Sequence, residues 1–312
     1  GQHRRRHGER GAHHAADHHL VALGPGGVAQ AERLGQAAGL VELDVDDVIA
    51  PDHRFQGGEV AHGFVCRDGN RMRQPFQVMA FGDRQRLLDK LDALGIADNT
   101  IVIFTSDNGP WLSYGDHAGQ TGIYREGKGT TFEGGVRVPF VARWTGMIPA
   151  GAVSDEPLMT IDLFPTIAYL LGTPLPAQHI DGKNATSLLL GEQGATSPQE
   201  AYYFYYKKND LEAMRYSKWK LHFPHGYRSM IGREIGNGGI PGKYDYGVKT
   251  GLELYDLAND PSESTNVAGD HPDVMERLMA LADTMRAELG DNLTETAPTG
   301  QRESGRITTK EE

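Results

Sequence analysis

Two oxygen-bearing side chains, Asp107 and Asn108, follow the apolar run Ile101–Phe104 in the stretch TIVIFTSDNGP. A carboxylate and a neutral carboxamide suit the hard cations Ca²⁺ and Mg²⁺ and suit soft metals poorly. After an intervening loop the chain places Lys128 between two glycines. A held cation and a nearby ammonium group can share one oxyanion, so these residue types predict phosphate or sulfate ester chemistry.

Each motif also has a simpler local interpretation. Asp-Asn-Gly is among the commonest turn sequences, and by itself it favours a plain turn. Gly122, Gly127 and Lys128 have the spacing of the phosphate loop G-x-x-x-x-G-K-[ST], but Gly129 replaces the hydroxyl residue that would hold Mg²⁺. No buried strand leads into the segment either. A nucleotide-binding loop is therefore disfavoured, and an exposed lysine in a flexible loop is the alternative for Lys128.

The elements that must position these residues are a helix and a strand. Leucines at 87, 88, 91 and 94 recur at helical spacing, and Gly95 stands where a left-handed cap ends a helix. The run Ile101–Phe104 predicts a strand buried on both faces, which is typical of a parallel sheet. Ligands in such α/β sheets bind beyond the carboxyl ends of the strands, where Asp107 and Asn108 lie.

The motifs TSDNGPW, GKGTTFEGGVRVP, IDLFPTIAYLLG and LYDLANDPSESTNVA occur here in the order seen in the sulfatase family, which the chain resembles from about residue 83 to residue 289. The match is similar to bacterial arylsulfatases. The resemblance implies an α/β fold: part of an alkaline-phosphatase-like mixed sheet, followed by a smaller C-terminal antiparallel sheet and helix.

By this resemblance, Asp107 and Asn108 match two calcium ligands, and Lys128 matches a lysine that contacts the substrate sulfate. The segment Glu133–Arg137 lies behind this lysine, and we assign it a supporting role. Family members hydrolyse sulfate esters with Ca²⁺ and a formylglycine made from Cys or Ser within C/S-x-P-x-R. The implied substrate is a small-molecule or carbohydrate sulfate ester, and the glycines beside Lys128 are expected to let the backbone approach it closely.

The sequence departs from the family at the nucleophile. Cys66 is the only cysteine, and it lacks the proline and arginine of the motif. Ser229 has Arg233 at the right distance but Ile231 in place of proline. The acidic pair Asp46–Asp47 does not stand in the context of the family's amino-terminal ligands. We therefore predict no catalytic residue in this chain and little or no turnover as written.

Composition divides the chain into four expected parts. Residues 1–82 hold eight of the thirteen histidines and no family motif, so we expect an atypical, poorly ordered or mis-framed segment. For residues 1–19 a histidine-rich metal-binding arm is the alternative. Residues 83–195 are expected to form the carboxyl part of the α/β domain, and residues 196–290 a C-terminal α+β subdomain. Residues 291–312 are expected to form a flexible tail.

Charge and hydropathy restrict the partners. The net charge of −11 and the pI near 5.6 argue against a nucleic-acid partner. No apolar run approaches membrane-spanning length, and one cysteine excludes an intrachain disulfide. No signal peptide is readable, so localisation and oligomeric state stay open. A phosphonate or phosphodiester hydrolase of the same superfamily and a noncatalytic acidic binding module remain alternative functions.

The remaining elements are expected to be scaffold. We predict a strand over residues 136–144, a helix over 162–171 capped by Asp162, three strands between residues 201 and 257, and a closing amphipathic helix that ends at Leu289. The Gly- and Pro-rich stretch 222–247 is expected to be a long loop that reaches back over the pocket and sets substrate choice. Its two histidines, His222 and His225, are expected to be solvated.

Overall fold

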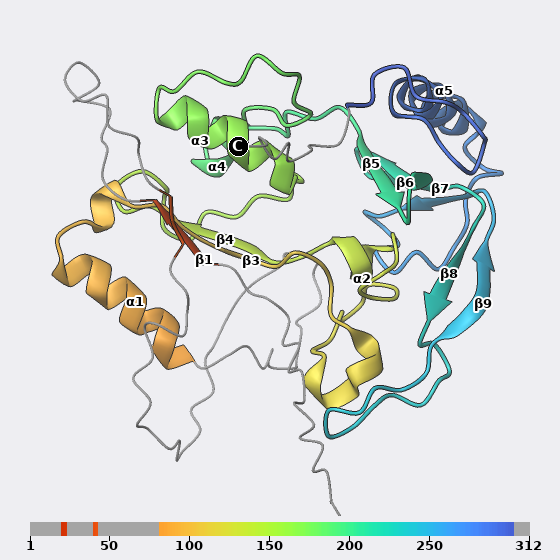
Figure 1. Ribbon diagram of the computed structural model, residues 1–312, viewed down its shortest axis with the longest axis horizontal. Helices are drawn as coiled ribbons and strands as arrows, with labels where there is room; N and C mark the ends of the chain where they lie inside the picture. The colour runs from red at the N-terminus through yellow and green to blue at the C-terminus, as the bar shows by residue number, and fades with distance from the viewer. Residues whose placement is uncertain (1–19, 24–39, 43–80, 303–312) are drawn as a thin grey trace, which may run out of the picture.

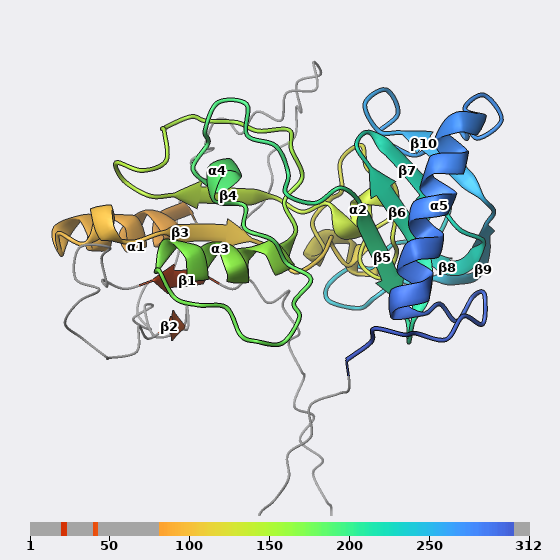
Figure 2. The same ribbon diagram turned by 90° about the horizontal axis from the view of Figure 1, so that it is seen from above.

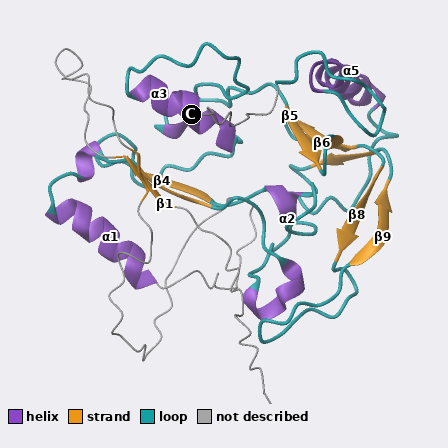
Figure 3. Ribbon diagram, in the orientation of Figure 1, coloured by secondary structure: helices purple, strands orange, loops and turns teal. Residues whose placement is uncertain are grey.

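The computed structural model describes residues 20–23, 40–42 and 81–302, which form two regions lying side by side (Figure 1). The first region is a small sheet with helices around it, and the second is an antiparallel sheet with one long helix (Figure 3). The predicted α/β class, with a smaller C-terminal antiparallel sheet and helix, is confirmed. In the described ranges, no helix is both long and apolar enough for a membrane span.

Strand β3, Val102–Thr105, lies inside the first sheet, whose strand order is β2-β1-β3-β4. The other strands are β1 (Leu20–Leu23), β2 (Leu40–Glu42) and β4 (Phe140–Arg143). Strand β3 is antiparallel to both β1 and β4, so the parallel pairing predicted for it is wrong for its described neighbours. The apolar run correctly indicated burial in the first half of β3, but burial does not determine strand direction.

The predicted helix before β3 is confirmed as α1, Phe81–Ala93. Gly95 has φ of 66° and donates its N–H to the Asp92 carbonyl at 3.0 Å, which ends the helix as expected for a left-handed cap. Helix α3, Leu163–Leu170, lies on the other side of the sheet from α1 (Figure 1). The shorter α4, Thr186–Leu189, was not predicted.

Asp162, predicted to cap α3, makes no capping bond to that helix. Its carboxylate instead accepts hydrogen bonds from the Met159 N–H at 3.3 Å, the Lys183 N–H at 2.8 Å and the Gln199 side-chain amide at 2.6 Å. The residue is fully buried, so a carboxylate there needs several donors. Asp162 therefore stands at the start of α3, as predicted, but its carboxylate joins the backbone at Met159 and Lys183 to the Gln199 side chain instead of capping the helix.

The second sheet has the order β10-β7-β6-β5, and all its ladders are antiparallel. Its strands are β5 (Tyr202–Tyr206), β6 (Asp210–Tyr216), β7 (Trp219–His222) and β10 (Glu253–Asp256). Helix α5, Pro272–Leu289, packs across this sheet (Figure 2). The shared core consists of Ala201, Leu211, Met214, Leu221, Phe223, Leu254, Leu278 and Ala282.

The stretch predicted as a long loop contains two paired strands. Strand β8, His225–Ser229, is antiparallel to β9, Asp245–Thr250, and only the residues between them form a loop. Alternate residues of β8 are buried, but these are a histidine, a tyrosine and a serine. The sequence of β8 therefore lacks the alternation of apolar and polar residues that usually marks a half-buried strand.

The residues after α5 are not a loose tail at their start, contrary to the prediction. Asp291 is fully buried, and its carboxylate accepts from the Leu211 N–H at 3.1 Å and from Arg286 Nε at 3.0 Å. A backbone bridge joins Asp291 to Thr296. The first part of this segment is thus fastened to the second sheet because it supplies a buried acceptor for the Leu211 N–H of β6.

Candidate functional site

The turn after β3 presents two uncommitted oxygen-bearing side chains. Asp107 is exposed and Asn108 is half-buried. The Ser106 hydroxyl donates to the Asn108 carbonyl at 2.9 Å, which tightens the turn. Within residues 81–302, neither the Asp107 carboxylate nor the Asn108 carboxamide forms a hydrogen bond or ion pair with another residue. Both groups are therefore available to a ligand.

Backbone hydrogen bonds join this turn to the loop that carries Lys128. The Gly109 N–H donates to the Gly135 carbonyl at 2.9 Å, and the Lys128 N–H donates to the Pro110 carbonyl at 3.0 Å. The second bond places Lys128 beside Pro110, which follows Asn108 by two residues, although Lys128 and Asn108 are 20 positions apart along the chain. The structure brings the backbones of all three sequence-predicted site residues into one neighbourhood.

Glycines make this close packing possible. A Cβ at Gly109 would lie 1.8 Å from the Gly134 carbonyl oxygen, a distance that no side chain tolerates. A Cβ at Gly127 would lie 2.6 Å from the Pro110 carbonyl oxygen, and one at Gly129, where φ is 88°, would overlap the Arg228 guanidinium. We expected the glycines around Lys128 to admit substrate. In the structure these glycines admit neighbouring protein atoms, and a close approach of the backbone to substrate stays a prediction.

The ammonium group of Lys128 lies over the indole ring of Trp111, 5.1 Å from its centroid. This separation allows a cation–π interaction, which is modest at a half-buried position. No ion pair or hydrogen bond to the Lys128 ammonium occurs among the residues that the structure describes. The charge of Lys128 therefore stays available to an anion, while Trp111 limits the directions in which the side chain can point.

A buried charged cluster lies behind the Lys128 loop, where the two regions meet. Lys220 on β7 is fully buried and contacts Glu133 at 2.8 Å and Glu263 at 3.3 Å. Glu263 also accepts from the Glu133 N–H at 2.6 Å and contacts His222 Nε2 at 2.8 Å. The cluster joins the second sheet to helix α2, Glu133–Val136, which directly follows the loop. The supporting role assigned to Glu133 thus has a physical basis.

The protonation states in this cluster follow from burial and neighbouring charge. Burial by itself would raise the pKa of Glu263, but the Lys220 charge and the hydrogen bond from His222 hold that pKa below its ordinary value. Burial lowers the pKa of His222, and the Glu263 hydrogen bond only partly offsets this effect. These two directions favour a neutral His222 beside an ionised Glu263.

Both histidines predicted to be solvated are buried. His222 is fully buried and stacks on Phe132 with 4.3 Å between ring centroids. The Phe223 carbonyl lies 2.7 Å from His225 Nδ1, and because a carbonyl oxygen only accepts, Nδ1 carries the proton and donates it. Burial lowers the pKa of His225 to about 4. Composition suggested an exposed loop here, but the strand pairing of β8 places these rings inside.

Acidification is expected to destabilise the fold through these two histidines. They ionise at an ordinary pKa of 6.5 in the unfolded chain but only at lower pH in the folded chain, so the unfolded state takes up protons first. Stability is then fully present above pH 6.5 and falls as the pH drops towards 4. The raised pKa values of Glu126 and Glu212 act in the opposite sense. Thermal unfolding measured across this range checks the prediction.

A matched pair of variants isolates the histidine contribution. His225→Gln should unfold with a weaker dependence on pH than the unmodified chain, because one buried titrating group is removed. His179→Gln should behave like the unmodified chain, since His179 is largely exposed. An identical pH dependence in all three proteins would contradict this account of His225.

Sequence reasoning did not assign Glu263 a role, although it lies in the motif LYDLANDPSESTNVA. The motif builds a tight turn in which the Asp260 carboxylate accepts from the N–H groups of Ser264 and Thr265, each at 2.8 Å. Glu263, with φ of 52°, is directed from this turn into the buried cluster. The only sequence signal for this role was the presence of an acidic residue in a family motif. Its partner, Glu133, is 130 positions away, and this contact is visible only in the fold.

The loop between β8 and β9 reaches the segment that follows Asn108. The N–H groups of Gly236 and Gly242 both donate to the Ser113 carbonyl, at 2.9 and 2.7 Å. Ser113 belongs to the 3-10 helix Leu112–His117. The loop is therefore fastened to the segment after Asn108, whereas its reach over a pocket and its influence on substrate choice stay predictions.

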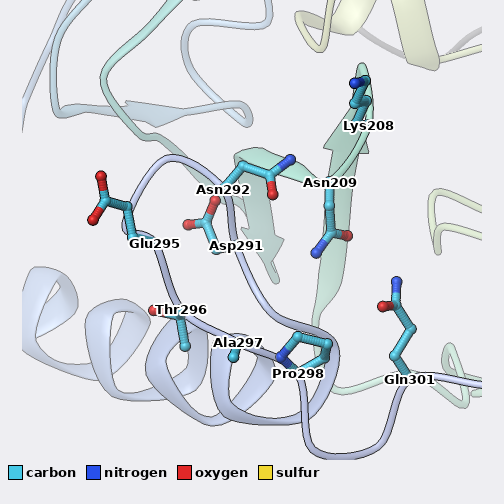
Figure 4. A pocket seen from close by; sticks show the side chains of 9 residues that line it. All are labelled: Lys208, Asn209, Asp291, Asn292, Glu295, Thr296, Ala297, Pro298 and Gln301. Atoms are coloured by element: carbon cyan, nitrogen blue, oxygen red, sulfur yellow. The ribbon is translucent and has the colours of Figure 1, made fainter.

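A separate depression of about 460 Å³ lies on the second region, away from these residues (Figure 4). Its lining residues are Lys208, Asn209, Asp291, Asn292, Glu295, Thr296, Ala297, Pro298 and Gln301. The buried Asp291 carboxylate at its wall is already engaged by backbone N–H groups and Arg286. Neither the turn after β3 nor the Lys128 loop contributes to it, so this depression is not the candidate site.

Metal binding has to be judged from the donors present. Two oxygen donors, Asp107 and Asn108, suit a hard cation, but Ca²⁺ takes about six to eight oxygen ligands. Within the described ranges, no group of three His, Cys, Asp or Glu side chains is arranged to hold a metal. Asp46–Asp47 and Cys66 lie outside the described residues. The donors therefore fit part of a calcium site.

Two family models match this chain. The model described as Sulfatase matches residues 85–173, and the model described as the C-terminal region of aryl-sulfatase matches residues 197–308. These ranges contain the turn after β3, the Lys128 loop and the buried cluster behind it. Each of the motifs on which the resemblance rested lies in the matched ranges or at their edges.

Known sulfatases are similar to this chain over about two thirds of its length. Human arylsulfatase A is 38% identical over 206 residues, covering 62% of this chain and 39% of that protein. N-acetylgalactosamine-6-O-sulfatase of Bacteroides thetaiotaomicron is 34% identical over 214 residues, covering 64% and 39%. A solved sulfatase from Pseudoalteromonas sp. superposes with a TM-score of 0.53 at 29% identity, covering 66% and 41%. The chain thus spans about two fifths of each of these proteins.

Proposed function

Because the carboxyl-terminal portion of this chain belongs to the sulfatase family, we propose that it forms the sulfate- and calcium-binding part of a sulfuric ester hydrolase. One observation carries the proposal. Backbone hydrogen bonds at Gly109 and Lys128 fasten the turn bearing Asp107 and Asn108 to the loop bearing the lysine. We propose that two oxygen donors and one ammonium group, all without a competing polar partner in the described part of the chain, bind a shared ligand.

In this proposal Asp107 and Asn108 hold the metal through their side-chain oxygens. When bound, Ca²⁺ supplies positive charge that stabilises the negative charge on the oxygens of the sulfate group during ester cleavage. Lys128 contributes a point charge with three N–H donors to the same oxygens. Trp111 keeps the lysine oriented, and the cluster behind the loop keeps its backbone in place.

The substrate class follows from the relatives by analogy only. One relative is named an arylsulfatase and another an N-acetylgalactosamine-6-O-sulfatase, so an aryl or a carbohydrate sulfate ester is the proposed substrate. The sequence contains no C/S-x-P-x-R motif, and without a nucleophile the covalent step cannot occur. We therefore propose that these 312 residues alone bind the sulfate group but turn over little or no ester.

Calcium titration by calorimetry tests the metal assignment. The unmodified chain is expected to bind Ca²⁺ weakly, because only part of the ligand set is present, and Asp107→Ala is expected to abolish the binding. Asp155→Ala removes an exposed carboxylate elsewhere and serves as the matched control. Calcium binding of equal strength in the chain and in Asp107→Ala would show that the ion binds elsewhere.

A further inference from the structure

We infer that Arg228, on the second region, is a positioning residue for the sulfate-binding lysine. Its Nε and Nη2 atoms donate to the Lys128 carbonyl oxygen at 3.2 and 2.6 Å. The Lys128 N–H is engaged by the Pro110 carbonyl on the other side. Both peptide groups that flank the lysine Cα are thus fixed from outside the loop. The inference rests on the proposed function, since it assigns Lys128 the sulfate.

Three successive residues of β8 hold the loop around Lys128. Tyr227 accepts a hydrogen bond from Arg125 Nη2 at 2.9 Å, and the Ser229 hydroxyl donates to Glu126 Oε1 at 2.6 Å. Tyr227 and Ser229 are buried, whereas Arg228 is half-buried and lies where the register of β8 against β9 shifts. Of the three, Arg228 is the residue whose side chain contacts the lysine.

The loop needs such support because its backbone is unfavourable on its own. Glu126 adopts φ of 58°, a left-handed conformation that non-glycine residues seldom occupy, and it is buried. Gly129, with φ of 88°, leaves the space that the Arg228 guanidinium fills. A residue held in a strained conformation persists only where its surroundings determine it. The hydrogen bonds from β8 hold the loop in this conformation on both sides of Lys128.

Arginine suits this task better than lysine would. Its planar guanidinium presents two parallel N–H groups to one carbonyl oxygen, whereas an ammonium acts as a single point donor. The guanidinium is itself oriented by the ring of Tyr244, which lies 4.6 Å below its central carbon. A rigid chain of contacts therefore runs from Tyr244 through Arg228 to the Lys128 backbone, and from there to the ammonium group.

A double-mutant cycle on sulfate affinity tests this role. The 312-residue chain is titrated with inorganic sulfate in the presence of Ca²⁺, and the Trp111 indole N–H signal is followed by nuclear magnetic resonance. Arg228→Gln is expected to weaken sulfate binding about tenfold. In a Lys128→Ala background the same change should have no further effect, because Arg228 acts through the lysine. Arg228→Lys should give an intermediate loss of sulfate affinity. If Arg228→Gln does not fold, the same cycle with Lys128→Ala is carried out with Arg228→Lys.

The possible outcomes separate the inference from the proposed function. Arg233→Gln, which removes another arginine of the β8–β9 segment, should leave sulfate affinity unchanged. Equal losses from the Arg228 change with and without Lys128 would overturn the positioning role, as would unchanged affinity in both Arg228 variants. If Lys128→Ala alone binds sulfate as the unmodified chain does, the proposed function fails first and the inference fails with it.

Discussion

Replacing Lys220 by methionine is expected to lower the free energy of unfolding by about 3–5 kcal/mol, because two carboxylates lose their buried countercharge. Lys220 is fully buried and contacts both Glu133 and Glu263. Methionine keeps much of the side-chain volume, so loss of charge is the main change. Chemical denaturation followed by circular dichroism measures the effect.

Lys218→Met is the matched control on the same hairpin. Lys218 pairs with Asp256 at 2.7 Å, but its side chain is 44% exposed. An exposed pair contributes about 0–1 kcal/mol, so this variant should lose little stability. Adding Glu263→Gln to Lys220→Met should recover part of the loss, because one uncompensated buried charge is removed. Similar small losses in both lysine variants would show that the buried cluster does not hold the two regions together.

Replacing Lys128 by alanine is expected to weaken the binding of inorganic sulfate roughly 10- to 100-fold in the presence of Ca²⁺, since a hydrogen bond to a charged group contributes about 1.5–3 kcal/mol. The ammonium group has no competing polar partner in the described ranges, so little stability should be lost with it. Calorimetric titration with sulfate measures the affinity, and thermal unfolding checks that the fold is retained.

Lys243→Ala removes an exposed lysine from the loop between β8 and β9 and leaves the net charge equal to that of Lys128→Ala. This control should bind sulfate like the unmodified chain. If the two variants lose affinity equally, the sulfate is attracted by general charge and Lys128 has no special place in its binding.

Local patterns predicted the elements that carry their own periodicity. The leucine spacing before Gly95, the apolar run of β3 and the amphipathic pattern of α5 each reported a helix or strand that the structure contains. The order of the four motifs identified the family from residue types alone. These features depend on neighbours within one or two turns of chain, and that information is present in the sequence.

Long-range pairing produced the differences. Strand β3 is antiparallel to its described neighbours because segments distant in sequence lie beside it, and no local pattern encodes that choice. His222 and His225 are buried because β7 and β8 place them against Phe132 and Glu212. Composition suggested a solvated loop, since Gly and Pro flank these histidines. Pairing with distant acids and rings overrides that local signal.

The candidate site shows the same division. Residue types at Asp107, Asn108 and Lys128 predicted its chemistry, but its support came from partners that sequence spacing cannot reveal. Glu133 and Glu263 are 130 positions apart, and Lys128 and Arg228 are 100 positions apart. The site therefore depends on contacts across the two regions, and these contacts became visible only when the fold was known.

The most direct test of the account is a crystal structure of this chain soaked with Ca²⁺ and selenate, in which the selenium is located by its anomalous scattering. The account predicts a cation ligated by the side-chain oxygens of Asp107 and Asn108, with a selenate oxygen about 3 Å from the Lys128 ammonium nitrogen. Selenate bound at another surface, or a cation that contacts neither Asp107 nor Asn108, would contradict it.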